Sequence, residues 1–202
     1  MKQNRIILTD VDGCLLDWEW AFAVWMQERG WVQRPNAKDY YKISDQFENL
    51  DEGQAKKFTR LFNESAAIGF LPPLRDSVYW MRRLNEELGY RFHAITSLST
   101  DSNAQKLRCM NLEKYYGDVF DKVICLETGG DKDEALAEYA GTALWWIEDK
   151  PANADIGHKL GLRSVLLEHG HNMDHECPYP IVKNWREIFD LVSTDEEDYI
   201  SL

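Results

Sequence analysis

Short apolar runs recur along the chain, and each is bounded by polar or turn-forming residues. Runs of this length and setting predict buried β-strands. The runs that we expect to form strands are residues 5–9, 91–96, 122–126, 144–147 and 164–167. Between the later runs, apolar residues recur at helical spacing over residues 76–88, 100–112, 131–139 and 152–160. Strands that alternate with helices predict a parallel sheet covered by helices on both faces.

The stretch between the first two predicted strands is much longer than the others. It covers residues 10–90, whereas a crossover between parallel strands needs only about a dozen residues. An aromatic stripe at helical spacing within residues 18–29 and a second helical pattern over residues 54–67 predict an inserted helical unit. Pro72 and Pro73 then mark its end.

These elements predict a fold of the α/β class with an insertion and a tail. We expect a Rossmann-like core, a small helical cap inserted after the first strand, and a disordered acidic tail that follows a last helix over residues 184–192. The expected boundaries are residues 1–16 and 74–192 for the core, 17–73 for the cap and 193–202 for the tail.

Composition and charge narrow the range of partners. The chain has 202 residues and a net charge of −12, which disfavours duplex nucleic acid because that binding depends on Lys and Arg. An anionic small molecule stays compatible with this charge, since a local cation can override it. The cysteines form no CxxC pair, and no apolar run approaches the roughly 20 residues that span a bilayer. We expect a cytoplasmic protein without a signal peptide or a membrane partner.

Two carboxylates follow directly on the first apolar run. Asp10 and Asp12 are separated by one residue, and in an extended chain such residues point to the same side, roughly 6–7 Å apart. Open parallel sheets bind ligands at the carboxyl ends of their strands. Asp10 and Asp12 could therefore address one substrate. The alternative is an Asx turn that ends the strand, in which Gly13 supplies a positive φ.

A hydroxyl and a cation stand at comparable places further along the chain. Thr96 ends the second predicted strand, where its hydroxyl could bind a phosphate oxygen or simply cap a turn. Lys132 begins a predicted helix, where a cation is unfavourable with respect to the helix dipole. That position suits a side chain that binds an anion, although a surface pairing with Glu127 or Asp131 would explain it too.

The fourth predicted strand also ends in acids, Glu148 and Asp149. Asp10 and Asp149 follow different strands that end at the same edge of the sheet, and together they offer the hard oxygen ligands that suit Mg²⁺. Such a cation would offset the repulsion between an attacking carboxylate and a phosphate dianion. The sequence therefore indicates a Mg²⁺ site at this edge.

Together these positions resemble the haloacid dehalogenase-like (HAD) hydrolase superfamily over about residues 5–168. The residues that carry the resemblance are Asp10-Val11-Asp12-Gly13, Thr96, Lys132 and Glu148-Asp149. The resemblance implies a parallel five-stranded sheet of order 5-4-1-2-3 with a small helical cap. It also implies the activity of a phosphatase, that is, a phosphoric monoester hydrolase.

The resemblance further implies a role for each motif residue. Asp10 would form a covalent aspartyl-phosphate, and Asp12 would act as general acid and base. Thr96 and Lys132 would hold phosphoryl oxygens. Mg²⁺ would be bound by Asp10, by the backbone carbonyl of Asp12 and by Asp149. The second acid at Asp12, which dehalogenases of the superfamily lack, favours phosphoryl transfer.

Two features of the acidic motif at the end of the fourth predicted strand stay open in the sequence. Glu148 could be a metal ligand or an orienting group. Many relatives carry an Asp four residues after the metal-binding one, whereas this chain has Asn153, which we expect to support the metal from outside its ligand shell.

A His-rich segment, residues 168–177, contains further ligand types and is either a surface loop or a transition-metal site.

The substrate implied by the resemblance is a small phosphorylated metabolite. Residues 10–18 look similar to the deoxyribonucleotidase branch of the superfamily, so a nucleoside monophosphate is the first expectation, with its base stacked on aromatic residues of the cap. A phosphotransferase, a sugar-phosphate phosphatase and a non-catalytic binding protein with the HAD fold are the alternatives. The oligomeric state is left open.

Overall fold

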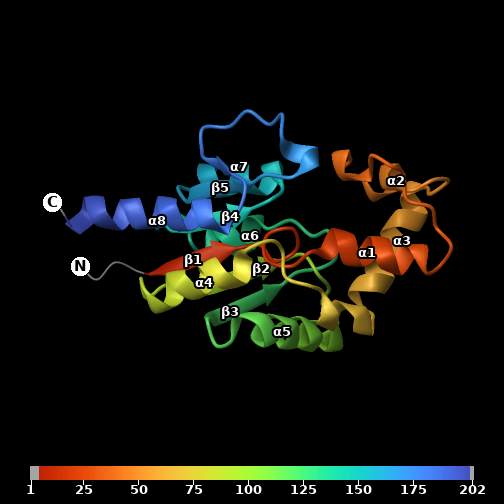
Figure 1. Ribbon diagram of the computed structural model, residues 1–202, viewed down its shortest axis with the longest axis horizontal. Helices are drawn as coiled ribbons and strands as arrows, with labels where there is room; N and C mark the ends of the chain where they lie inside the picture. Colours follow the sequence, from red (N-terminus) through yellow and green to blue (C-terminus); the bar gives the residue numbers. More distant parts are fainter. Residues whose placement is uncertain (1–4, 201–202) are drawn as a thin grey trace.

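The computed structural model describes residues 5–200 and contains one parallel sheet of six strands in the order β3-β2-β1-β4-β5-β6 (Figure 1). The strands are β1 (Ile6–Thr9), β2 (Arg91–Thr96), β3 (Phe120–Cys125), β4 (Trp145–Glu148), β5 (Arg163–Leu167) and β6 (Ile181–Val182). From the other edge, the first five strands follow the order 5-4-1-2-3. The predicted α/β, Rossmann-like sheet is thereby confirmed.

Helices cover both faces of this sheet (Figure 1). One face carries α4 (Ser77–Glu86), α5 (Ser102–Tyr116) and α8 (Trp185–Ile200), and the other carries α6 (Asp133–Ala137) and α7 (Pro151–Lys159). Neighbouring strand residues point to opposite faces. Ile7 and Ile147 therefore pack on the face covered by α4, α5 and α8, while Leu8 and Trp146 pack on the face covered by α6 and α7. Because both faces are covered, the strands read as continuous apolar runs.

The insertion between β1 and α4 folds as the predicted helical cap. Its elements are α1 (Trp18–Gln27), η1 (Ala37–Asp39), α2 (Ile43–Gln46), α3 (Glu52–Asn63) and η2 (Ala66–Phe70). The chain enters and leaves the cap side by side, because Leu16 pairs with Pro73. The cap, drawn in orange in Figure 1, lies beyond the carboxyl ends of the strands. It therefore stands over the edge where the motif residues gather.

Aromatic side chains form the interior of the cap. Phe62 is buried and makes edge contacts with Trp18, Phe22 and Trp25, with ring centroids 5.3–5.6 Å apart. Trp18 stacks on Phe22 at 4.7 Å. Such contacts stabilise a small helical unit beyond the area that they bury. The aromatic stripe of α1 is therefore mainly the packing surface of the cap.

Two predictions about the C-terminal part are wrong. We expected five strands, but β6 follows β5 and pairs with it, with Leu166 opposite Ile181. A strand of two residues is too short to give an alternating pattern. We also expected residues 193–202 to be a disordered tail, yet α8 continues to Ile200. Residues 201–202 lie outside the described part.

The extension of α8 has a physical cause. The start of α8 is anchored because Ile188 and Val192 are buried against the sheet. A helix that is already nucleated and packed adds further turns at little cost. Asp195, one of the acids that we assigned to the tail, also forms an ion pair with Arg163. Within residues 5–200, no helix is both long enough and apolar enough to cross a membrane.

Candidate active site

The carboxyl edge of the sheet positions the first two acids. Asp10 directly follows β1, and its backbone N–H donates to the carbonyl of Ile147 in β4 at 2.9 Å. The backbone of Asp10 is thus held as an extension of the sheet. Asp12 lies in the turn that follows, where it pairs with Leu16 in an isolated bridge. Both acids therefore stand on backbone fixed by the central strands.

Gly13 allows the acids of two strands to approach each other. Its φ is +79°, a left-handed conformation that residues with a Cβ adopt only at a cost. A Cβ at this position would lie 2.2 Å from Oδ2 of Asp149. The turn interpretation and the functional interpretation of this motif are therefore compatible, since the turn brings Asp149 up to β1.

Lys132 lies inside the site rather than at the surface. The residue is 1% exposed, and its Nζ lies 2.8 Å from Asp10 and 2.8 Å from Glu148. Burial by itself would lower the pKa of Lys132, but the charges of Asp10 and Glu148 outweigh burial and raise it. Lys132 therefore stays charged. The alternative of a surface pair with Glu127 or Asp131 is wrong.

Thr96 lies at the end of β2 and is fully buried. Its hydroxyl has no hydrogen-bond partner among residues 5–200, although buried hydroxyls normally have one. A buried donor of this kind at the carboxyl edge is available to a ligand oxygen. This fits a phosphoryl-binding role better than the alternative of a turn cap.

Three carboxylates form a cluster at this edge. Asp10, Glu148 and Asp149 each offer an oxygen, and these oxygens lie within 4.8 Å of one another. Burial raises the pKa of Asp10 to about 7, with Glu148 and Asp12 adding to the effect and Lys132 opposing it. Burial, followed by the charge of Asp10, also raises the pKa of Asp149 to about 7. The cluster thus holds more negative charge than Lys132 balances, which fits a divalent cation.

Glu148 differs from the two aspartates in its hydrogen bonds. Its Oε1 accepts from the backbone N–H groups of Asp149 and Lys150, both at 3.1 Å. Its Oε2 accepts from Lys132 at 2.8 Å and from the amide of Asn153 at 3.2 Å. Four donors fill the acceptor capacity of a carboxylate. The geometry therefore favours the orienting role for Glu148 and leaves Asp10 and Asp149 as the side chains that could bind a metal.

Arg108 is a site residue that sequence reasoning missed. It lies on α5 and is fully buried, and its Nη1 and Nη2 donate to Oδ1 and Oδ2 of Asp12 at 2.6 and 3.0 Å. The two partners are 96 positions apart, so local patterns do not connect them. One signal was present in the sequence, since Arg108 interrupts the apolar stripe that Ala104 and Leu112 form at helical spacing.

The His-rich segment 168–177 packs against the site. His169 Nε2 lies 2.7 Å from the carbonyl of Gly13, and the Asn172 amide donates to the carbonyl of Asp149 at 2.7 Å. The His171 ring contacts Tyr41 of the cap, with centroids 5.3 Å apart. Over residues 5–200, the acidic cluster is the one group of three or more metal-ligand side chains with suitable spacing. The segment therefore joins core and cap.

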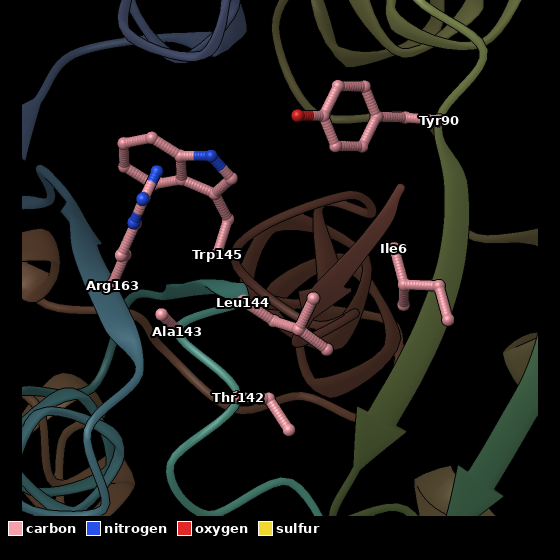
Figure 2. A pocket seen from close by; sticks show the side chains of 7 residues that line it. All are labelled: Ile6, Tyr90, Thr142, Ala143, Leu144, Trp145 and Arg163. Carbon is pink, nitrogen blue, oxygen red and sulfur yellow. The ribbon is translucent and has the colours of Figure 1, made fainter. Parts of the chain in front are cut away.

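A cavity of about 140 Å³ lies at the opposite end of the sheet. The residues that line it are Ile6, Tyr90, Thr142, Ala143, Leu144, Trp145 and Arg163 (Figure 2). Ile6, Trp145 and Arg163 are the first residues of their strands. Figure 2 shows Arg163 beside the Trp145 ring, which its guanidinium approaches to 5.3 Å. The cavity therefore opens at the amino ends of the strands, away from the acidic cluster.

Comparison with known proteins gives one relative in sequence and many in structure. No family model matches the chain. Over 160 residues it is 24% identical to an uncharacterized 32.4 kDa protein from the Gp30–rIII intergenic region of enterobacteria phage T4. This match covers 76% of the chain and 57% of the relative. The chain thus spans little more than half the length of that protein.

Three solved structures show where the fold belongs. A haloacid dehalogenase-like family protein of Streptococcus pneumoniae is similar with a TM-score of 0.64 and 17% identity, covering 95% of this chain and 100% of that one. L-2-haloacid dehalogenase of Xanthobacter autotrophicus, with chloropropionic acid covalently bound, has a TM-score of 0.61 and 12% identity, covering 94% of this chain and 98% of that one. The HAD-hydrolase YfnB of Bacillus subtilis, bound to magnesium, has a TM-score of 0.60 and 16% identity, covering 95% of this chain and 100% of that one. The chain has the haloacid dehalogenase-like fold, as its motif residues predict.

Proposed function

We propose that the chain is a Mg²⁺-dependent phosphomonoester hydrolase whose nucleophile is the carboxylate of Asp10. The observation that carries this proposal is the surroundings of Asp10. A buried Lys132 lies 2.8 Å away, and Asp149 supplies a second carboxylate within 4.8 Å. Thr96 adds a buried hydroxyl that no other described residue binds. Cation, hydroxyl and paired acids are what a phosphoryl group needs for binding and transfer.

The residues of the chain have a role in both halves of the reaction. In the first, a carboxylate oxygen of Asp10 attacks phosphorus, the bond from phosphorus to the leaving oxygen breaks, and Asp12 gives that oxygen a proton. In the second, Asp12 takes a proton from water as the water oxygen attacks phosphorus. Phosphate leaves, and Asp10 returns to its carboxylate form. Lys132 and Thr96 hold phosphoryl oxygens during both halves.

Asp10, Asp149 and the backbone carbonyl of Asp12 would hold Mg²⁺. When bound, Mg²⁺ supplies positive charge that offsets the repulsion between the acids and the phosphate dianion. Two observations support this assignment. Asp10 and Asp149 are buried beside each other, so burial and then neighbouring charge raise their pKa values, and the HAD-hydrolase YfnB was solved with magnesium bound. Glu148 orients the site through Lys132 and Asn153.

A small phosphorylated metabolite is the proposed substrate, and nucleoside monophosphates are the first class of candidates. The cap beside the acidic edge suits a compact molecule better than duplex nucleic acid or a membrane surface, which the net charge of −12 also disfavours. Trp20 is 57% exposed and could stack on a base, whereas Trp18 and Phe22 stack on each other. Sugar phosphates are the second class of candidates. A sugar hydroxyl could also replace water as the acceptor of the phosphoryl group. We keep a cytoplasmic location as an expectation.

The test is release of phosphate from nucleoside monophosphates, sugar phosphates and 4-nitrophenyl phosphate, with Mg²⁺ and with a chelator. We expect release that depends on Mg²⁺ and that is lost in Asp10→Asn. Asp121→Asn is the matched control, because Asp121 pairs with Arg91 near the amino ends of β3 and β2, away from the acidic cluster. Chloride release from 2-chloropropionate without phosphate release would overturn the proposal and indicate a dehalogenase.

A further inference from the structure

The pair formed by Arg108 and Asp12 is unusual in its burial. Arg108 is 0% exposed, and both of its terminal nitrogens are directed at the two oxygens of Asp12. Its Nε is buried and has no hydrogen-bond partner within the described part of the chain. Asp12 keeps 23% of its side chain exposed. The guanidinium therefore lies on the inner side of Asp12, and part of the carboxylate stays exposed on its other side.

This burial is costly unless the pair has a task. Removing a guanidinium from water is unfavourable, and a well-packed apolar side chain is often as stable as a buried ion pair. Position 108 belongs to a stripe of α5 where Ala104, Leu112 and Tyr116 pack in the core, so an apolar residue would suit it. Stability of α5 alone thus gives no reason for an arginine there.

The geometry accounts for the arginine through Asp12. A bidentate guanidinium fixes the plane and the position of a carboxylate, which a single hydrogen bond does not do. Each oxygen of Asp12 receives one donor from Arg108 and keeps a second acceptor direction. Asp12 can therefore exchange a proton on its exposed side while Arg108 holds it from the inner side.

We propose, on the basis of the proposed function, that Arg108 is a positioning residue that holds Asp12 for proton transfer. As the bond from phosphorus to the leaving oxygen breaks, Asp12 gives its proton to that oxygen, and the carboxylate that results is paired with Arg108. The same carboxylate then takes a proton from the water that attacks phosphorus. Arg108 touches neither the substrate nor the reacting atoms.

This role makes a prediction that a purely structural role does not make. An alkyl phosphate needs a proton on its leaving oxygen, whereas 4-nitrophenolate leaves without one. Because kcat/KM reports the steps up to formation of the aspartyl-phosphate, a misplaced Asp12 should lower kcat/KM for the alkyl ester more than for the aryl ester. A loss of folded protein would lower both by the same factor.

The experiment compares kcat/KM for an alkyl phosphate and 4-nitrophenyl phosphate in the full chain with Mg²⁺. The variants are wild type, Arg108→Met, Arg108→Lys, Asp12→Asn and Arg108→Met combined with Asp12→Asn. Arg91→Met is the matched control, because Arg91 pairs with Asp121 at the amino end of β2. Circular dichroism and thermal melting check that each variant is folded.

We expect Arg108→Met to lower kcat/KM for the alkyl phosphate by roughly 10- to 100-fold and for 4-nitrophenyl phosphate several-fold less. Arg108→Lys, which keeps the charge without the fork, should show the same selectivity with a smaller loss. In the Asp12→Asn background, replacing Arg108 should change kcat/KM by less than about twofold, because the two residues act as one unit.

Equal losses for both substrates, or losses from Arg108→Met and Asp12→Asn that multiply, would overturn the role of Arg108 while leaving the proposed function standing. Absence of phosphate release from the wild type would overturn the proposed function itself. If Arg108→Met does not fold, Arg108→Lys decides the question by its selectivity between the two substrates.

Discussion

Lys132 and Arg108 are the two fully buried basic side chains within the described residues, and each is paired with an acid that follows β1, Asp10 or Asp12. Sequence reasoning found Lys132, because its place at a helix start conflicts with the helix dipole. It missed Arg108, because the partner of Arg108 is distant in the chain and the resemblance assigns nothing to α5. Asp10, Thr96 and Asp149 were placed at one edge because each stands at the carboxyl end of a predicted parallel strand.

Lys132→Met should remove both activity and stability. The substitution leaves the acids at Asp10 and Glu148 without their cation, and breaking a buried ion pair from one side costs about 3–5 kcal/mol. We expect the free energy of unfolding in urea at neutral pH to fall by that amount, and kcat to fall by at least about 100-fold. Lys122→Met, which breaks an exposed pair with Glu138, should have little effect on either quantity. Similar results for the two variants would contradict the account of Lys132.

Gly13→Ala should weaken Mg²⁺ binding as well as folding. The left-handed φ of Gly13 costs an alanine about 1–2 kcal/mol, and the new Cβ would also displace Asp149. Gly30→Ala is the matched control, since Gly30 has a φ of +84° and an added Cβ would meet no atom within 4 Å. Titration calorimetry should show Mg²⁺ affinity reduced by about tenfold or more in Gly13→Ala and unchanged in Gly30→Ala. Equal affinities would argue against Asp149 as a ligand.

At the scale of elements, five strands and the helices between them were predicted, because apolar runs and helical periodicity are properties of local sequence. The two errors have different causes. β6 gives no pattern of its own and exists because Leu166 and Leu167 of β5 offer a free edge. α8 continues beyond Val192 because its first turns are packed, which the acidic composition of the segment does not reveal.

The cap should depend on its aromatic interior. Phe62 contacts three aromatic rings there and is fully buried, so Phe62→Ala should lower the free energy of unfolding by about 3–5 kcal/mol. Phe70, also in the cap, is 70% exposed, and Phe70→Ala should leave stability nearly unchanged. Urea unfolding followed by tryptophan fluorescence measures both. A small effect of Phe62→Ala would mean that the aromatic cluster does not stabilise the cap.

At the scale of the whole molecule, metal, protons and folding are linked through the acidic cluster. The pKa values of Asp10 and Asp149 are about 7 in the folded chain, against ordinary values near 4 when it is unfolded. Between these pH values the folded chain binds more protons than the unfolded chain. The free energy of unfolding therefore falls as the pH rises from about 4 to about 7. Mg²⁺ competes with the same protons and should stabilise most above that range.

We therefore expect the rise in Tm caused by saturating Mg²⁺ to be larger at pH 8 than at pH 5.5, and the Tm with chelator to be lower at pH 8. Differential scanning fluorimetry in matched buffers measures both. Asp149→Asn should lose most of the Mg²⁺ effect at pH 8. A rise in Tm that is independent of pH, or that survives in Asp149→Asn, would place Mg²⁺ outside this cluster.

Acid quenching followed by peptide mass spectrometry tests whether Asp10 becomes phosphorylated during turnover. The substrate is 4-nitrophenyl phosphate with Mg²⁺, and the protein is compared as wild type, Asp12→Asn and Asp10→Asn. We predict a phosphoryl group on the peptide that contains Asp10, in larger amount in Asp12→Asn because its removal by water is slowed, and none in Asp10→Asn. Release of phosphate by Asp10→Asn at the wild-type rate, with no phosphorylated peptide in any of the three proteins, would contradict the account.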